Sequence, residues 1–346
     1  MIETTSDDDR AAAADDAPPA TMRAVVAHAY GDVDVLDIAD MPVPTPADDE
    51  LLVRVEASSL NALDWHFLTG TPYVLRLMNG LRRPKRTIPG ADVAGVVVGI
   101  GSAVTRHRVG DAVFGECPGG GCAPYLTVRE GNVVAKPAGV SFEAAGATPV
   151  AGLTALQGLR THAELRPGEH VLVNGAAGGV GTFAVQIAKA LGAEVTAVCS
   201  SRNVDLVRSL GADRVVDYTT EDVVDGGARF DVMLDNVGNH TPAQCRSMLR
   251  PDGRFVAVSG PKTNRWLGPI PHVVRAGLAF RRAPQSFHQF TASPVEADLV
   301  TLGEMLADGS ITPALDRTVG LDGVVAALAE IGTGHTRAKI GVVPTR

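Results

Sequence analysis

The chain of 346 residues carries a formal net charge of −8, and its 45% hydrophobic and 20% charged residues exclude a largely disordered protein. Six acidic residues and one basic residue lie in the first 20 positions, so residues 21–346 carry a net charge of only −3. A body so close to neutrality predicts no nucleic-acid partner, and the lack of any run of 18 apolar residues predicts no integral membrane span.

The N-terminal segment and the cysteines bear on cellular location. Residues 1–20 lack apolar periodicity and are predicted to form a disordered acidic tail. This acidity is unlike a secretory signal or a transit peptide, and four scattered cysteines are too few for a disulfide framework. We therefore expect a cytoplasmic protein. Cys117 and Cys122 are close enough in sequence either to form a reversible disulfide or to remain separate thiols.

The first third of the chain reads as short strands separated by glycine, proline and aspartate. Strands are predicted at residues 22–28, 50–57 and 93–100, and a short helix at 62–68. This pattern indicates a mainly antiparallel β domain over residues 21–147.

From residue 148 the chain alternates between helices and strands. Helices are predicted at 148–159, 178–191, 203–210 and 241–249, and strands at 169–174, 194–199, 214–216, 230–235 and 254–259. Such alternation predicts an α/β domain with a doubly wound parallel sheet over residues 148–285. Helices at 294–308 and 321–331 and a strand at 339–343 follow, so residues 286–346 are predicted to return to the first domain.

Two segments mix basic and apolar residues. Residues 81–86 hold four bases and are typical of a solvated loop. Residues 262–290 are compatible with a lid, a wall of a substrate pocket, a subunit contact or a peripheral membrane contact.

A glycine-rich turn lies between a buried strand and an apolar helix. Within residues 171–181 the predicted dinucleotide contacts are Gly175, Ala177, Gly178, Gly179, Val180 and Gly181. A strand, a glycine turn and a helix in this order allow a pyrophosphate to approach the backbone N–H groups at the positive end of the helix. The alternative is a plain tight turn.

The end of the next strand distinguishes between two dinucleotides. NAD sites usually place Asp or Glu there, whereas this chain has Ser200, Ser201 and Arg202. Two hydroxyls and a guanidinium can hold a 2′-phosphate, which favours NADPH. A solvated turn is the alternative.

Four motifs in this order carry a family resemblance: Asn61-Ala-Leu-Asp64, Gly90-Ala-Asp-Val-Ala-Gly95, Gly152-Leu-Thr-Ala155 and the glycine-rich turn. From residue 22 onward the chain resembles the medium-chain dehydrogenase/reductase superfamily, and within it the zinc-independent quinone oxidoreductases, including reticulon-4-interacting-protein-like reductases. The resemblance implies a Rossmann domain that binds the dinucleotide, a GroES-like catalytic domain and a homodimer.

The metal ligands of zinc-dependent relatives are missing. By the resemblance, Asn61 stands where those relatives have a cysteine ligand, and Ala91 where they have a histidine ligand. Alanine cannot bind a metal, and an amide is a poor zinc ligand. We therefore expect no metal. Without a Lewis acid, acceptors that are already electrophilic are favoured, namely quinones and conjugated enones.

The resemblance also assigns roles to single residues. Asn61 is expected to orient the acceptor, Asp64 to fix the turn beside it, His66 to supply a proton and Thr154 to border the nicotinamide. The other expected cofactor contacts are Tyr218 on the adenosine side, Asn236 and Ser259 at the strand ends, and Lys339 near a phosphate. Asn61 as a helix cap, His66 as a plain core or surface residue and Lys339 as a surface lysine are the alternatives.

These observations predict an enzyme that transfers a hydride from NADPH to a quinone or conjugated enone without zinc. A metal-free alcohol or aldehyde dehydrogenase of the same superfamily is one alternative. A non-catalytic NADPH-binding interaction protein is the other, because a fold and a cofactor site do not by themselves establish turnover.

Overall fold

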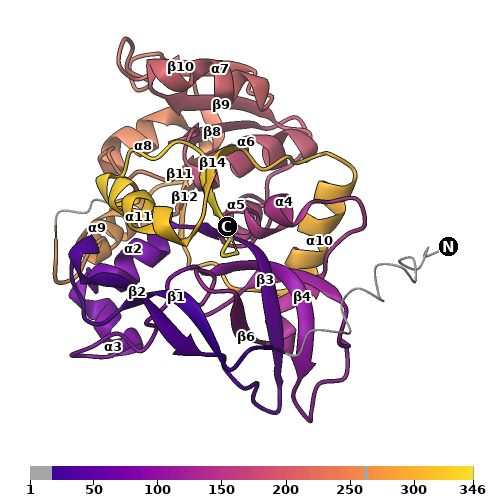
Figure 1. Cartoon of the computed structure of the whole chain (residues 1–346). Helices are drawn as coiled ribbons and strands as arrows, with labels where there is room; N and C mark the ends of the chain where they lie inside the picture. Colours follow the sequence, from indigo (N-terminus) through magenta and orange to yellow (C-terminus); the bar gives the residue numbers. More distant parts are fainter. Residues whose placement is uncertain (1–17, 261–263, 346) are drawn as a thin grey trace.

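A computed structural model describes residues 18–260 and 264–345 (Figure 1). Most of the predicted tail, residues 1–20, lies outside these ranges. The strands of the described chain form one sheet of two strands, one of six and one of seven. None of the helices in these ranges is both long and apolar enough to cross a bilayer.

The predicted β domain is present and mainly antiparallel. β1 and β2 form the small sheet, and the large sheet has the order β14-β15-β3-β4-β5-β7, with β6 paired to β3. Leu51, Val53 and Val55 alternate along β3 with their side chains fully buried, as expected for a strand with one face in a core. The strands are β1 (Thr21–Ala27), β2 (Leu36–Pro42), β3 (Glu50–Leu60), β4 (Asp92–Ile100), β5 (Ala112–Glu116), β6 (Tyr125–Arg129), β7 (Val133–Ala135), β14 (Leu315–Val319) and β15 (Lys339–Val342).

The C-terminal strand returns to this domain, as predicted. β15 lies between β14 and β3 within the large sheet, pairing parallel to β14 and antiparallel to β3. The helices associated with this domain are α2 (Ala62–Thr69), α3 (Arg76–Asn79), α4 (Phe142–Gly146) and α11 (Val324–Thr333).

The six-stranded sheet is parallel throughout, with the order β10-β9-β8-β11-β12-β13. This is the strand order of a dinucleotide-binding Rossmann fold, and it confirms the predicted doubly wound domain. Its strands are β8 (His170–Asn174), β9 (Glu194–Cys199), β10 (Arg214–Asp217), β11 (Phe230–Asp235), β12 (Leu249–Ala257) and β13 (Ser286–Gln289). Its helices are α5 (Pro149–Leu156), α6 (Gly179–Ala190), α7 (Val204–Ser209), α8 (Pro242–Met248), α9 (Ile270–Phe280) and α10 (Glu296–Ala307).

The predicted domain boundary at residue 285 is too early. β13 pairs with β12 and is the last strand of the Rossmann sheet, so residues 286–289 do not return to the catalytic domain. Ser286-Phe-His-Gln is short and mixes polar with aromatic residues, and strand pairing rather than local pattern fixes its structure.

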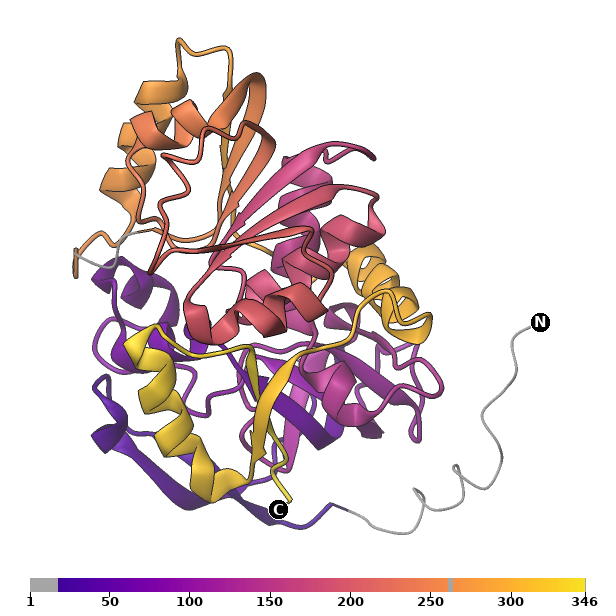
Figure 2. The ribbon, with the colours of Figure 1, turned by 90° about the horizontal axis from the view of Figure 1, so that it is seen from above.

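One core connects the two domains. Ala94 and Phe114 from the catalytic sheet belong to the same buried cluster as Leu153 of α5 and Val171 of β8. α5 continues into a π-helix over Gln157–His162 and packs between the sheets together with α10. Seen from above, the two domains lie side by side with the C-terminal segment at their junction (Figure 2). This junction positions the site.

Candidate active site

The glycine-rich turn follows β8 at the carboxyl edge of the parallel sheet and leads into α6. Gly175 has a φ of 76°, a left-handed conformation that favours glycine. A Cβ on Gly181 would lie 2.2 Å from the carbonyl oxygen of Gly175 and 2.6 Å from Cα of Ala176, so no larger residue fits where α6 crosses the turn. This close backbone packing and the start of α6 suit a pyrophosphate.

The same sheet edge holds an unpartnered buried acceptor. Asn236, which follows β11, donates from Nδ2 to the carbonyl oxygen of Asn174 at 3.0 Å, whereas its Oδ1 has no hydrogen-bond partner among the described residues. A buried polar atom without a partner is costly unless a ligand supplies one. Ser259 is half-buried just after β12, at the same edge. The free acceptor of Asn236 and the hydroxyl of Ser259 therefore suit a dinucleotide lying across this edge.

Ser200, Ser201 and Arg202 follow β9, as predicted. Ser201 shares a hydrogen bond of 2.7 Å with the hydroxyl of Thr219, and Arg202 donates to the carbonyl oxygen of His335 at 2.7 Å. Arg202 is exposed and forms no ion pair with a described carboxylate. Its guanidinium thus has further N–H groups for an anionic ligand.

A pocket of about 340 Å³ lies next to this group of residues. Tyr218 lines it together with Val198 from the end of β9 and with Asn239 and His240 from the loop after β11. The Tyr218 side chain is 57% exposed, so it offers an open ring face at the position predicted for the adenosine side.

A buried polar cluster joins the C-terminal strand to the turn before α2. The Lys339 ammonium donates to Oδ1 of Asn61 at 2.5 Å, to Oδ2 of Asp92 at 3.1 Å and to the carbonyl oxygen of Leu60 at 3.3 Å. Asn61 donates to Oδ2 of Asp92 at 2.8 Å, and the Ser59 hydroxyl donates to the same oxygen. All four side chains are at most 9% exposed.

This cluster decides against two alternatives, a surface position for Lys339 and a plain helix cap for Asn61, whereas the contact of Lys339 with a cofactor phosphate stays a prediction. Lys339 is 2% exposed, so the alternative of a surface lysine is wrong. Its three N–H donors are all engaged by protein acceptors, which leaves none for a phosphate in this arrangement. Asn61 directs its side chain to Asp92 and Lys339, so it does more than cap a helix.

The cluster is tied to the glycine-rich turn. The N–H of Ala338 donates to the carbonyl oxygen of Ala177 at 2.7 Å, and Gly178 forms an isolated parallel bridge with Ala338. A Cβ on Gly179 would lie 3.0 Å from Cδ of Lys339, so the lysine stem runs along the turn. The predicted phosphate site and the predicted catalytic residues therefore meet at β15.

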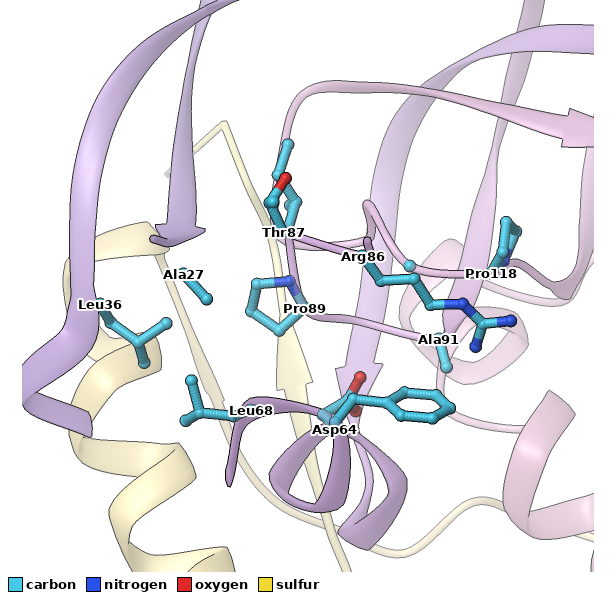
Figure 3. Close-up of a pocket in the computed structure, with 12 residues that line it drawn as sticks. Ala27, Leu36, Asp64, Leu68, Arg86, Thr87, Pro89, Ala91 and Pro118 are labelled. Atoms are coloured by element: carbon cyan, nitrogen blue, oxygen red, sulfur yellow. The ribbon is translucent and has the colours of Figure 1, made fainter. Parts of the chain in front are cut away.

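Asp64 fixes the turn beside Asn61, as expected. Its two oxygens accept from the N–H of Asn61 and the N–H of Gly90, each at 2.8 Å. Burial raises the pKa of its carboxyl from 3.8 to about 6. Asp64 also lines a small pocket with Arg86 and Ala91, with a cavity volume of about 20 Å³ (Figure 3). This small pocket therefore borders the turn that Asp64 holds in place.

His66 lies on α2 and Thr154 on α5. Nδ1 of half-buried His66 lies 2.8 Å from the carbonyl oxygen of Thr71 and must carry the proton, because a carbonyl only accepts. Thr154 donates to the carbonyl oxygen of Val150 at 2.7 Å, and the N–H of Val150 donates to Oδ1 of Asp92 at 2.7 Å. Asp92 therefore anchors the helix that carries Thr154.

Sequence reasoning missed Asp92, Ser59 and Glu116 as site residues. Asp92 and Glu116 are opposite one another on β4 and β5. Burial and the nearby Asp92 raise the pKa of the Glu116 carboxyl to about 7. Asp92 could have been found from the sequence, because an acidic residue at the start of an apolar run, as in Gly90-Ala-Asp-Val, indicates a buried carboxyl.

The donors near Asn61 suit hydrogen bonding better than metal binding. Ala91 is 3% exposed and has no ligand atom, and the amide of Asn61 is occupied by Asp92 and Lys339. Cys117 and Cys122 are separate buried thiols, and burial raises the pKa of both well above the usual value.

Comparisons with known proteins agree with this architecture. Residues 47–148 match the family model of the alcohol dehydrogenase GroES-like domain, and residues 210–342 match that of zinc-binding dehydrogenases. A chloroplastic quinone oxidoreductase, QR1 of Triphysaria versicolor, is 33% identical over 93% of this chain and 98% of its own. The chloroplastic NADPH-dependent alkenal/one oxidoreductase of Arabidopsis thaliana is 32% identical over 94% of this chain and 80% of its own.

A solved structure extends the similarity to three dimensions. The quinone oxidoreductase of Coxiella burnetii superposes with a TM-score of 0.83 at 28% identity, covering 93% of this chain and 99% of that protein. Similarity of this extent covers both domains and the cluster between them. The chain is therefore a member of the medium-chain dehydrogenase/reductase superfamily and belongs to its quinone oxidoreductase group of pyridine-nucleotide-dependent oxidoreductases.

Proposed function

We propose that this protein transfers a hydride from NADPH to a quinone or a conjugated enone without a metal ion. The observation that carries the proposal is the meeting of two features at β15. The Ala338–Ala177 hydrogen bond places the glycine-rich turn against the buried cluster of Lys339, Asn61 and Asp92. The names of the relatives in Triphysaria and Arabidopsis support quinone and enone acceptors.

The residues of the turn would hold and orient the dinucleotide. When bound, its dihydronicotinamide ring supplies the hydride. Gly175, Gly178 and Gly181 let the phosphates approach the backbone, and Oδ1 of Asn236 offers an acceptor at the sheet edge. Ser200, Ser201 and Arg202 would bind the 2′-phosphate and so distinguish NADPH from NADH.

The buried cluster would position the acceptor. Asn61 has one further amide N–H, because the hydrogen bond to Asp92 uses only one of its two. That N–H can stabilise the oxygen of a quinone or enone as negative charge develops on it. The reduced acceptor must then gain a proton, and we assign its delivery to Nε2 of His66 in the imidazolium form, which becomes neutral while Nδ1 keeps its proton toward the carbonyl oxygen of Thr71.

Zinc independence rests on the chemistry of the donors. The family description that matches residues 210–342 is that of zinc-binding dehydrogenases. Here Ala91 has no ligand atom, and Oδ1 of Asn61 already accepts from the Lys339 ammonium. Activity should survive dialysis against a chelator. Loss of activity that added zinc restores would overturn this part of the proposal.

The central experiment measures dinucleotide oxidation with NADPH and with NADH against quinones, enones, aldehydes and alcohols. We expect turnover with quinones or enones and a preference for NADPH. Turnover confined to alcohols or aldehydes would favour the dehydrogenase alternative. Binding of NADPH without turnover of any acceptor would favour the interaction protein.

Two further properties belong to this proposal. A homodimer is inferred from the resemblance, and sedimentation equilibrium tests it directly. Location in the cytoplasm is inferred from the acidic tail and the absence of a disulfide framework, whereas the two plant relatives are named as chloroplastic proteins. Fractionation of cells that produce the native chain distinguishes these locations.

A further inference from the structure

Two segments from different domains form one exposed surface. The N–H of Tyr73 donates to the carbonyl oxygen of Arg265 at 2.8 Å, and the N–H of Val74 donates to that of Trp266 at 3.2 Å. The rings of Tyr73 and Trp266 meet edge to face with centroids 5.1 Å apart. Figure 1 shows α3 and α9 on the same flank of the molecule. We call the exposed side chains of residues 77–86 and 265–282 the basic apolar surface.

The apolar content of this surface is high. Of the fourteen large hydrophobic residues that are exposed within the described ranges, eight lie here: Leu77, Met78, Leu81, Trp266, Leu267, Ile270, Val274 and Leu278. An exposed patch with this many large apolar side chains marks an interaction site.

α9 has apolar residues on two faces. Phe280 belongs to a buried cluster of the Rossmann domain, and Ala276 is also buried. Ile270, Val274 and Leu278, spaced four residues apart, form an exposed stripe along the helix. Packing within the chain therefore does not explain the stripe.

The charge on this surface has one sign. The sequence contains no acidic residue from 65 to 91 or from 253 to 295. Exposed bases lie in both stretches: Arg82, Arg83, Lys85, Arg86, Arg265, Arg275, Arg281 and Arg282. Across residues 18–260 and 264–345, none of these eight forms an ion pair with a carboxylate. The concentration of positive charge is notable in a chain of net charge −8.

We propose that the basic apolar surface binds the face of an anionic phospholipid bilayer. Bases attract the headgroups, while the exposed stripe of α9 and the side chains of Leu77, Met78 and Trp266 enter the boundary with the acyl chains. Tryptophan is favoured at that depth. Contact of this surface with itself in a two-fold dimer would bring like charges together, so the charge favours an anionic partner over a second copy.

Vesicle sedimentation tests the proposal without turnover, so its outcome is independent of the proposed enzyme activity. The full chain should bind vesicles of phosphatidylglycerol and phosphatidylcholine at least tenfold more tightly than vesicles of phosphatidylcholine alone. About 0.5 M salt should weaken the binding by screening the charges. Equal binding to both vesicle types, or none to either, would overturn the proposal.

Matched variants separate this surface from general charge effects. Replacing Arg275, Arg281 and Arg282 by Gln should weaken binding at least tenfold. Replacing Arg108, Arg166 and Arg229 by Gln removes the same charge from exposed positions elsewhere and should leave binding within twofold. Val274→Ser with Leu278→Ser should also weaken binding, with the Tm of each variant confirming folding. Equal losses in the two arginine sets would contradict the proposal.

Tryptophan fluorescence locates the contact. The chain has two tryptophans, and Trp266 is 71% exposed. Its emission should shift to shorter wavelength on anionic vesicles, and Trp266→Phe should abolish that shift. An unchanged shift in Trp266→Phe, or a dimer in solution that the arginine variants dissociate, would assign this surface to another contact and overturn the proposal.

Discussion

The Lys339 ammonium lies 2.5 Å from Oδ1 of Asn61, although 278 positions separate the two residues in sequence. Asn61 ends the turn after β3, and Lys339 begins β15, which pairs with β3. This contact therefore depends on correct pairing between the beginning and the end of the chain. It also places the only cation of the buried cluster beside Asp92.

Lys339→Met should destabilise the protein by about 3–5 kcal/mol, because it leaves the Asp92 carboxylate buried without its ionic partner. Urea denaturation measures the change. Lys189→Met is the control, since the exposed pair of Lys189 with Asp213 contributes about 1 kcal/mol or less. The double variant Lys339→Met with Asp92→Asn should recover part of the loss. Equal midpoints for wild type and Lys339→Met would contradict this role.

Gly181→Ala should weaken NADPH binding at least tenfold, because the new methyl would lie 2.2 Å from the carbonyl oxygen of Gly175 and force the turn apart. Fluorescence titration with NADPH measures the effect. Gly277→Ala in α9 is the matched control, since its Cβ meets no atom within 4 Å. That control should bind normally and gain stability through the better helix propensity of alanine. Unchanged binding by Gly181→Ala would argue against a phosphate at this turn.

Arg202→Gln should raise the KM for NADPH roughly tenfold, the effect of one lost hydrogen bond to a charged group. The KM for NADH should change little, because NADH has no 2′-phosphate. Arg208→Gln removes an exposed arginine one turn and a half further along the chain and serves as the control. If KM rose equally for NADPH and NADH, Arg202 would have a structural role and would not recognise the 2′-phosphate.

Ionisation of Asp64 should lower the free energy of unfolding as the pH rises from about 4 to about 6. Its native pKa of about 6 exceeds the usual 3.8, so the native state holds this proton more tightly than the unfolded state does. Ionisation of the buried carboxyl therefore lowers the free energy of unfolding by about 3 kcal/mol. This decrease is complete above about pH 6. Urea denaturation across pH 4–8 measures the dependence.

Two variants isolate the Asp64 contribution. Asp64→Asn should lack this part of the pH dependence, so that its free energy of unfolding declines less between pH 4 and 6 than that of wild type. Asp40→Asn changes an exposed aspartate and should follow the wild-type curve in shape. Parallel curves for wild type and Asp64→Asn would refute a raised native pKa.

The regular elements of the Rossmann domain were predictable from sequence. β9 and β11 have the bounds expected from their apolar runs, and α6 differs from its predicted limits by one residue at each end. Each element has a strong local signal, because central parallel strands are apolar throughout and α6 presents a continuous apolar face.

α9 was not predicted as a helix, for a physical reason. Pro271 and Gly277 weaken its helix propensity, and apolar residues on two faces obscure the usual alternation between a buried and a polar side. Tertiary packing of Phe280 fixes its buried face. The apolar residues on the second face, which obscured the helical pattern in the sequence, are those that form the exposed stripe.

The candidate site likewise has one part that could be predicted from sequence and one part that could not. The glycine-rich turn is local and was read from spacing alone. The cluster of Lys339, Asn61 and Asp92 is long-range, and no local pattern shows that Lys339 is buried or that Asp92 accepts from four groups on different elements. The family resemblance predicted that Asn61 contacts the acceptor and that Lys339 contacts a phosphate. It did not predict their hydrogen bonds with each other and with Asp92.

The position of β15 has a consequence for biosynthesis. Translation makes this strand after every other described strand, yet it lies inside the large sheet between β14 and β3. During translation the edge of β3 that pairs with β15 keeps open N–H and C=O groups until β15 has left the ribosome. The Rossmann strands, from β8 to β13, emerge earlier and can pair first. The catalytic sheet thus begins before the Rossmann sheet and is completed after it, so the nascent chain depends on protection of that open edge.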